Sequence, residues 1–493
     1  MKKISVLLCI IFIILTLSCT LTYEDTAEVS IDIGDIMPSR GSALPQIETG
    51  APIEIGGVRL TVRGPNMPKI EKKFLSGTIA ITIPAGADRE FYLEIYDTEQ
   101  SLAFIGTARA DLYPGATARI RIKLQTAPGW VPTVYVSSLS NAQMPDGSKQ
   151  YPFSTISDAI AYTQGPVEIR VAAGTYNESL QLRDGIRLKG GYNYDFSLRK
   201  FYSPADREDI NYKTTISSAA STYGTGIIYI TGGCLIEGFT IENTSGATSG
   251  DVNVIISDIF SYTNKPIYIL NNTINNNNAS ANATAIGITG AVNTHIVNNL
   301  ITMDKYNTYS KGIVFSINEL TQYASTYVIA NNAIQSNKAI ELADNSLGKY
   351  YVLGNSIDAA TAIAAESGDI YIANNIIIAS GASMTGASLD ITGKTQNNYI
   401  YYTGAAAADP ADYTGTSNIH NGSSLPSVNP TFNAILKAKE NIDIRIFTGG
   451  ANLSSVIDSM SVPDSIRALL YLDAENISRL PTWAIGAYQS SYM

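Results

Sequence analysis

The sequence is poor in charge, histidine and cysteine. Of its 493 residues, 15% are Asp, Glu, Lys or Arg, with two histidines and three cysteines. The formal net charge of −10 argues against a nucleic-acid partner, which would require clustered Lys and Arg. The chain also has no nucleotide-binding glycine motif, no zinc-ligand spacing and no Ser-His-Asp arrangement. The sequence therefore predicts no cofactor and no bound metal.

A short apolar run at the N-terminus predicts export. Residues 1–3 are basic, residues 4–15 are apolar but too few to span a bilayer comfortably, and residues 16–19 form a small-residue cleavage site. This pattern resembles a bacterial lipobox, although its leucines are displaced from the usual position. The resemblance implies cleavage after residue 18, lipidation of Cys19 and anchoring at the outer membrane or cell surface of a bacterium. An ordinary secretory signal is the alternative. Cys234 would be the only other cysteine of the mature chain, so no intramolecular disulfide is expected.

The next part of the chain predicts a small β domain. Residues 19–50 are polar and are expected to form a flexible tether. At 79–83 isoleucines alternate with small or hydroxyl residues, and at 119–124 basic and apolar residues alternate, which is typical of half-buried antiparallel strands. Residues 51–126 resemble an Ig-like or transthyretin-like β-sandwich. We expect this module to serve as a spacer or accessory domain.

Four ordered motifs indicate how the second domain begins. A strand, a short amphipathic helix with Ser154 or Thr155 as its N-cap, and further strands between glycine turns would cover the first coil of a solenoid. The motifs are Val-Tyr-Val-Ser at 134–137, Pro-Phe-Ser-Thr-Ile at 152–156, Ala-Gly-Thr-Tyr-Asn-Glu at 173–178 and Gly-Ile-Arg-Leu-Lys-Gly-Gly-Tyr at 185–192. Together they resemble the entrance of proteins of the pectin-lyase-like superfamily. The resemblance implies an all-β fold with a right-handed, single-stranded parallel β-helix over residues 133–424.

One phrase repeats through the centre of the chain. It reads Ile-Leu-Asn-Asn-Thr-Ile at 269–274, Ile-Val-Asn-Asn-Leu-Ile at 296–301 and Ile-Ala-Asn-Asn-Ala-Ile at 329–334. If both flanking isoleucines are buried, the chain must bend between the two asparagines, and Asn suits such a corner. Coils stacked about 4.8 Å apart would let the amides form a ladder. We therefore assign a structural role to a column that recurs at intervals of 27, 33, 23, 20 and 23 residues: Asn272, Asn299, Asn332, Asn355, Asn375 and Asn398.

Residues 425–493 resemble the closing segment of the same superfamily. Asn-Pro-Thr-Phe at 429–432 and Ala-Ile-Gly-Ala-Tyr at 484–488 match that pattern, while Asn476 stands where the family has glycine. The resemblance implies a C-terminal coil and cap.

Enzymes of this superfamily are mostly polysaccharide lyases or glycoside hydrolases, and their chemistry can be sought along the coils. A uronate lyase needs Ca²⁺ or an Arg for the substrate carboxylate and a basic group with a perturbed pKa. A hydrolase needs two carboxyl groups about 5–9.5 Å apart. No arginine occurs between Arg207 and Arg445, which removes that lyase partner from the central coils. Lys311, Lys338 and Glu341 remain as catalytic candidates, or as a solvated salt-bridge cluster.

Tyrosines in the loops of the central coils are candidates for sugar stacking. Aromatic rings on an elongated face can stack on sugar rings, although abundant tyrosine can also reflect ordinary surface packing. The candidates are Tyr306, Tyr309, Tyr323 and Tyr327. His295 precedes the buried Ile296 and is expected to be structural.

The sequence as a whole favours a surface lipoprotein with a non-catalytic β-helix scaffold that binds a polysaccharide or surface glycan, or serves adhesion. A polysaccharide lyase or glycoside hydrolase is the first alternative, and Ca²⁺ would be expected only there. A purely structural envelope protein is the second alternative.

Overall fold

The computed structural model divides the chain into two compact units, with the boundary between Pro132 and Thr133. It describes residues 25–32, 55–75, 79–201, 204–218, 226–244, 251–259, 265–276, 282–290, 292–316, 324–342, 348–365, 369–373, 375–385, 395–396, 398–402 and 419–420. The predicted signal, Cys19, Tyr323 and the predicted cap at 425–493 lie outside these residues. Within them, no helix is both long and apolar enough to cross a bilayer.

The N-terminal unit consists of two β-sheets around one core. A three-stranded sheet has the order β4-β1-β7, and a five-stranded sheet has the order β3-β2-β5-β6-β8. Buried side chains of both sheets, such as Ile31, Ile83, Leu60 and Phe91, belong to the same hydrophobic cluster. The strands are β1 (Thr26–Asp32), β2 (Ile55–Arg63), β3 (Ile70–Phe74), β4 (Ile79–Pro84), β5 (Gly86–Asp97), β6 (Leu102–Leu112), β7 (Thr117–Arg121) and β8 (Lys123–Thr126).

Strand β1 corrects the prediction that residues 19–50 form a tether. It lies between β4, to which it is antiparallel, and β7, to which it is parallel. Ala27, Val29 and Ile31 alternate along it and are buried. The domain therefore begins before residue 51, because an N-terminal strand supplies the middle of its smaller sheet.

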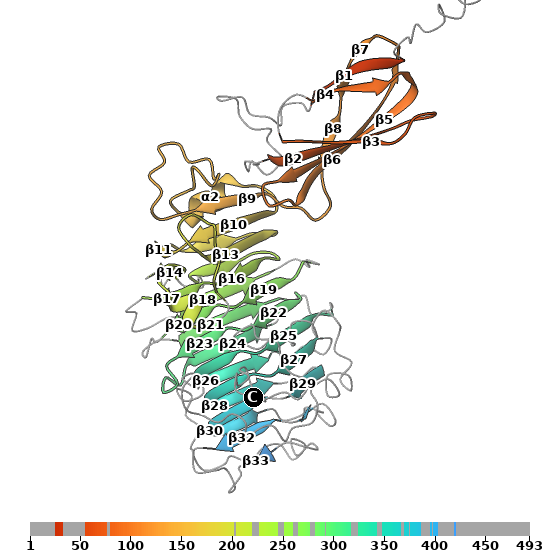
Figure 1. The fold of residues 1–493 in the computed structure, drawn as a ribbon. Helices are drawn as coiled ribbons and strands as arrows, with labels where there is room; N and C mark the ends of the chain where they lie inside the picture. The colour runs from red at the N-terminus through yellow and green to blue at the C-terminus, as the bar shows by residue number, and fades with distance from the viewer. Residues whose placement is uncertain are drawn as a thin grey trace, which may run out of the picture. The chain divides into compact units, whose positions relative to one another are not determined.

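The second unit is a parallel β-helix, which confirms the predicted fold class (Figure 1). All strand pairs within its two curled sheets are parallel. The first sheet contains β9 (Thr133–Val136), β10 (Val167–Ala172), β13 (Ile186–Tyr192), β16 (Leu235–Glu237), β19 (Ile267–Leu270), β22 (Thr294–Val297), β25 (Thr326–Ala330), β27 (Lys349–Leu353), β29 (Asp369–Ala373) and β31 (Thr395–Gln396).

The second sheet has fifteen strands and completes each coil. Strands β26, β28 and β30 have ten residues each, because a single strand continues where earlier coils have two. The strands are β11 (Gly174–Asn177), β12 (Leu180–Leu182), β14 (Thr214–Ser218), β15 (Ile228–Ile230), β17 (Thr240–Asn243), β18 (Asp251–Asp258), β20 (Thr273–Asn276), β21 (Asn282–Thr289), β23 (Leu300–Met303), β24 (Ser310–Ser316), β26 (Ala333–Leu342), β28 (Ser356–Ala365), β30 (Ile376–Thr385), β32 (Tyr399–Tyr402) and β33 (Ile419–His420).

The core of the β-helix is built from stacked aliphatic side chains. Ile269, Ile296, Ile329 and Val352 occupy one position in successive strands of the first sheet and are fully buried in the same cluster. Burial of such columns is the main favourable contribution to stacking the coils.

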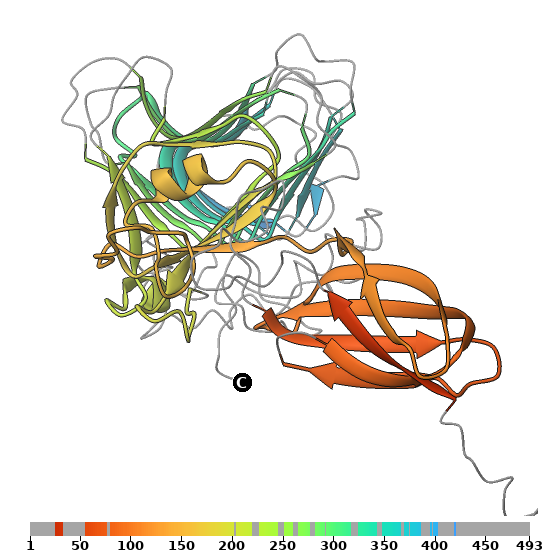
Figure 2. The ribbon, with the colours of Figure 1, turned by 90° about the horizontal axis from the view of Figure 1, so that it is seen from above.

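A short helix covers the first coil, as the sequence predicted. Helix α2 (Ile156–Tyr162) lies across the end of the stack in Figure 2 and contacts β9, β10 and β12. Thr155 is its N-cap and accepts a hydrogen bond from the Asp158 backbone N–H. The Glu178 carboxylate accepts from the N–H groups of Ile156 and Ser157, so a neighbouring coil also satisfies the helix terminus.

The chain turns from the first sheet to the second at a two-residue corner. Its first residue has a left-handed conformation, with φ of 55° at Asn271, 59° at Asn298 and 56° at Asn331. Glycine occupies this place at Gly238 and Gly354, with φ of 82° and 65°. Asn and Gly are the residues that tolerate this conformation best.

The second residue of the corner forms a buried asparagine ladder. Asn299 Oδ1 accepts hydrogen bonds from the N–H and Nδ2 of Asn272 at 3.0 and 3.1 Å, and Asn332 Oδ1 accepts the same pair from Asn299 at 2.9 and 3.0 Å. Asn299 Nδ2 also donates to the Ile269 carbonyl at 2.9 Å. The same pattern continues through Asn355, Asn375 and Asn398. Each amide therefore satisfies backbone groups that the bend takes out of the sheet ladder.

Candidate functional site

Two of the predicted stacking tyrosines lie on one exposed turn of the β-helix. The turn at 304–309 joins β23 to β24, and the Tyr306 and Tyr309 side chains are 84% and 63% exposed. The Asp304 carboxylate accepts from the Tyr306 N–H at 2.9 Å, and the Asn307 side chain accepts from the Tyr309 N–H at 3.0 Å. These side-chain turns fix the backbone that carries both rings.

The turn is also attached to two neighbouring coils. Lys305 Nζ lies 3.1 Å from Asp358 Oδ2 on β28, and the Lys305 carbonyl accepts from Asn337 on β26 at 3.0 Å. Gln335 donates to the same Asp358 oxygen at 3.0 Å. Asp358 is buried although it carries a charge, so its two partners are needed to offset desolvation. The tyrosine turn is therefore held against the coil rather than extending freely from it.

The prediction that Tyr327 is a surface stacking residue is wrong. Tyr327 is 2% exposed and belongs to the core of the β-helix. Its ring stacks on Tyr350 with a centroid distance of 4.7 Å and contacts the edge of Phe315 at 4.8 Å. Tyr327 lies in β25, two residues before the inward-facing Ile329, and strand alternation turns both residues inward.

The catalytic candidates Lys311, Lys338 and Glu341 form a salt-bridge cluster. Lys311 and Lys338 are neighbours in register on β24 and β26, and their Nζ atoms lie 2.6 and 3.7 Å from the Glu341 carboxylate. All three side chains are partly exposed. Both cations face the same carboxylate, so the arrangement provides neither a second carboxyl group for hydrolysis nor a separate base and carboxylate-binding group for elimination.

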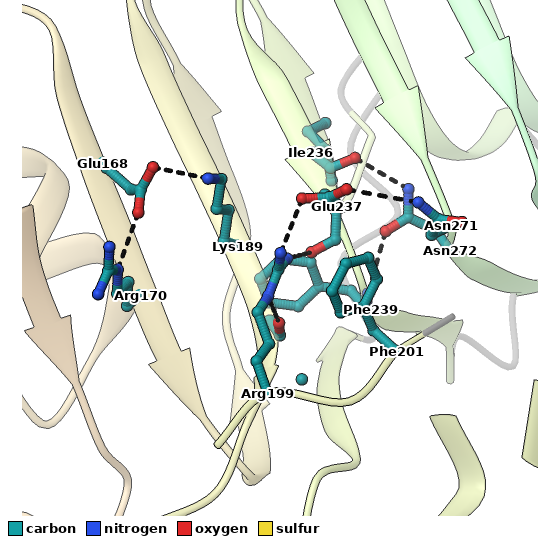
Figure 3. A network of polar contacts seen from close by, with 12 residues as sticks. Glu168, Arg170, Lys189, Arg199, Phe201, Ile236, Glu237, Phe239, Asn271 and Asn272 are labelled. Carbon is teal, nitrogen blue, oxygen red and sulfur yellow. Dashed lines mark hydrogen bonds and ion pairs between the residues drawn. The ribbon is translucent and has the colours of Figure 1, made fainter. Parts of the chain in front are cut away.

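Two further groups of charged side chains lie on the outer side of the first sheet, and sequence reasoning missed them. Glu168 on β10 contacts Arg170 Nε at 2.8 Å and Lys189 Nζ on β13 at 2.7 Å (Figure 3). Arg199 Nη1 lies 3.0 Å from Glu237 on β16. The sequence does contain a signal for these charged side chains: charged and apolar residues alternate along both strands. Charged residues flank the inward-facing Ile169 and Leu188 and must therefore point outward.

Electrostatics and packing explain why both groups are ordered. Burial raises the pKa of Glu168, but the hydrogen bonds and charges of Lys189 and Arg170 outweigh it and hold that pKa below its usual value. Arg199 lies 5.1 Å from the Tyr192 ring centroid and 3.7 Å from that of Phe201. These contacts fasten the segment that follows β13 to the outer side of the sheet, which indicates a structural role.

Two further titratable residues are inert in their surroundings. His295 stacks on Tyr268 at a centroid distance of 4.8 Å, and burial lowers its pKa to about 4, so it is neutral near pH 7. Cys234 is buried in the core, and burial raises the pKa of its thiol. Across the described ranges, no three His, Cys, Asp or Glu side chains are grouped closely enough to hold a metal ion.

Comparisons with known proteins place the chain in a family without assigning an activity. No curated protein matches it, and no solved structure matches it either. The family model described as "Protein of unknown function (DUF1565)" matches residues 140–400, which is more than half of the chain and covers most of the β-helix. The chain therefore belongs to the DUF1565 family.

Proposed function

We propose that this protein is a non-catalytic β-helix scaffold that binds glycan through Tyr306 and Tyr309. The observation that carries the proposal is that two strongly exposed rings sit on a turn fixed to the coil by Lys305 and Asp358. A pre-organised aromatic surface loses little conformational entropy when a sugar ring stacks on it.

The same proposal includes export and anchoring through lipidation of Cys19. Its support is the basic, apolar and small-residue pattern of residues 1–19. Replacement Cys19→Ser should move the protein from the membrane fraction to the soluble fraction. Continued membrane fractionation of this variant would contradict anchoring at Cys19 but would leave glycan binding untouched.

The glycan site is tested with an array of neutral and acidic polysaccharides, followed by calorimetry on each hit. The double variant Tyr306→Ala/Tyr309→Ala should lose at least about fivefold in affinity, because each stacked ring contributes about 0.5–1.5 kcal/mol. The matched control Tyr151→Ala/Tyr194→Ala removes two partly exposed tyrosines from the first coils and should bind as the wild type does. Equal affinity of both double variants would overturn the assignment of this turn.

The enzyme alternative is distinguished from non-catalytic binding by two assays on each bound polymer. One detects β-elimination by a lyase, and the other detects new reducing ends produced by a hydrolase. We expect no turnover with the wild-type chain. Turnover that Lys311→Met or Glu341→Gln abolishes would restore the charged cluster as a catalytic site and contradict the non-catalytic proposal.

A further inference from the structure

The outer side of the first sheet changes from polar to apolar along the stack. In β19–β29 the residues beside the inward-facing isoleucines point away from the core, because side chains alternate along a strand. They form two columns in register: Leu270, Val297, Ala330, Leu353 and Ala373, and beside them Tyr268, His295, Val328, Tyr351 and Tyr371. We call these ten side chains the outer apolar face.

Most of the outer apolar face is buried although it points outward. Val297, Val328, Ala330, Leu353 and Ala373 are between 0 and 2% exposed, yet none belongs to the core of the β-helix. Tyr351 stacks on Tyr371 with a centroid distance of 5.1 Å, which continues the column that Tyr268 and His295 begin. Such burial within a single chain means that another part of the same chain covers the face.

Where the strands of the first sheet end at the corner, the connection to the second sheet does not cover the outer apolar face. Val297 and Ala330 immediately precede the two-residue corner, which passes directly into the second sheet and has no length to fold back. On the earlier coils the cover is known: Arg199 and Phe201 lie over the polar part of the sheet, and Arg207 donates to the Asn271 carbonyl and Thr273 hydroxyl. The contacts of these three residues reach as far as Asn271, which directly follows Leu270 in the first strand of the outer apolar face.

We propose that residues 421–493 dock on the outer apolar face. The last described strand, β33, pairs with β32 at the end of the stack where the face also ends, and 73 residues (493 minus 420) follow it. The face spans five strands, or about 20 Å at the usual strand spacing, which about six extended residues can cross. The segment contains two apolar runs that suit such a surface, Ala-Leu-Leu-Tyr-Leu at 468–472 and Trp-Ala-Ile-Gly-Ala-Tyr at 483–488.

Photocross-linking in the full chain tests this docking directly. Tyr351 is replaced by p-benzoyl-phenylalanine, and the matched control carries the same group in place of Tyr306 on the exposed turn. Irradiation should join position 351, and not position 306, to tryptic peptides from 421–493 of the same chain. Cross-links from position 351 to residues before β2, to a second copy of the chain, or to no peptide of 421–493 would each overturn the proposal.

A second measurement remains informative if the bulky label perturbs the face. Ala330→Asp places an unpaired carboxylate on the outer apolar face, whereas Thr284→Asp places one at an outward, partly exposed position of β21 beside Lys311. Hydrogen exchange of the full chain should show amides in 421–493 exchanging at least tenfold faster in Ala330→Asp, with wild-type rates in Thr284→Asp. Unchanged exchange in Ala330→Asp would contradict docking on this face.

Discussion

At three corners, residues 271–272, 298–299 and 331–332, adjacent asparagines have different conformations and different partners. Asn298 adopts the left-handed conformation that Gly238 and Gly354 adopt elsewhere, whereas the side-chain amide of Asn299 forms hydrogen bonds to the coils on both sides. The sequence predicted a bend between the two residues and a ladder of amides. It did not divide these two roles between the first and second residue, because the repeated phrase contains the same residue type twice.

This division predicts opposite outcomes for two neighbouring substitutions. Asn299→Ala leaves the Asn272 N–H and the Ile269 carbonyl without side-chain partners in a buried site, and each such loss costs about 1–3 kcal/mol. We expect a loss of about 3–5 kcal/mol in the free energy of unfolding, measured in urea. Asn298→Gly should change it by less than about 1 kcal/mol, since glycine adopts the left-handed conformation freely. Equal losses would contradict the division.

His295 should make stability depend on pH in a specific window. Burial lowers its pKa to about 4 in the folded chain, whereas in the unfolded chain it is about 6.5. Between these two pH values His295 is protonated in the unfolded chain but neutral in the folded chain. The free energy of unfolding therefore falls as the pH falls from about 6.5 to 4. The variant His295→Phe keeps a ring beside Tyr268 without titrating.

The test compares urea unfolding of the two chains at pH 7 and pH 4. Wild type should lose about 2–3 kcal/mol more than His295→Phe over this interval. Other titrating groups are common to both chains and cancel in the difference. A parallel pH dependence would show that the imidazole is solvated.

At the scale of elements, strand β1 ties the start of the described chain into the N-terminal unit. Its partners β4 and β7 lie about 50 and 90 residues further along the chain, a separation that alternation in a short polar stretch does not reveal. Alternation at Ala27, Val29 and Ile31 was the only local signal for the strand. The sequence prediction therefore placed the domain boundary too late.

A charge on the inner side of β1 should unfold this unit alone. Val29→Asp buries an unpaired carboxyl in the core, which we expect to cost at least about 3 kcal/mol. Hydrogen exchange should show faster exchange throughout residues 55–126, with unchanged rates in β19–β28. Glu28→Ala alters the exposed side of the same strand and is the control. Accelerated exchange in both units would contradict independent folding.

The tyrosine turn depends on its attachment at Asp358. Asp358→Asn keeps the shape of the side chain but removes the charge that Lys305 Nζ contacts. We expect glycan affinity to fall about three- to tenfold through loss of pre-organisation. Glu341→Gln removes a carboxylate from the nearby charged cluster, outside the contacts that attach the turn, and should keep wild-type affinity. Equal affinities in calorimetry would show that the attachment is irrelevant to binding.

For the whole molecule, periodicity predicted the scaffold better than it predicted the surface. The stacked coils and the asparagine column follow from repeats that are visible in the chain, and the capping helix follows from the ordered motifs at its entrance. The prediction for Tyr327 was wrong because it ignored strand alternation: residues two apart on a strand point to the same side, so Tyr327 points inward with Ile329. The pair of Arg199 and Glu237 could not be predicted, because it joins residues 38 apart through a segment whose path no repeat specifies.

The most direct test of the account is titration of the wild-type chain and of Tyr306→Ala/Tyr309→Ala with the best polysaccharide from the array. The account predicts saturable binding by the wild type, an affinity at least about fivefold lower for the variant, and intact polymer recovered from both. Equal affinities, or a polymer shortened by the wild-type chain, would contradict a non-catalytic glycan site on this turn.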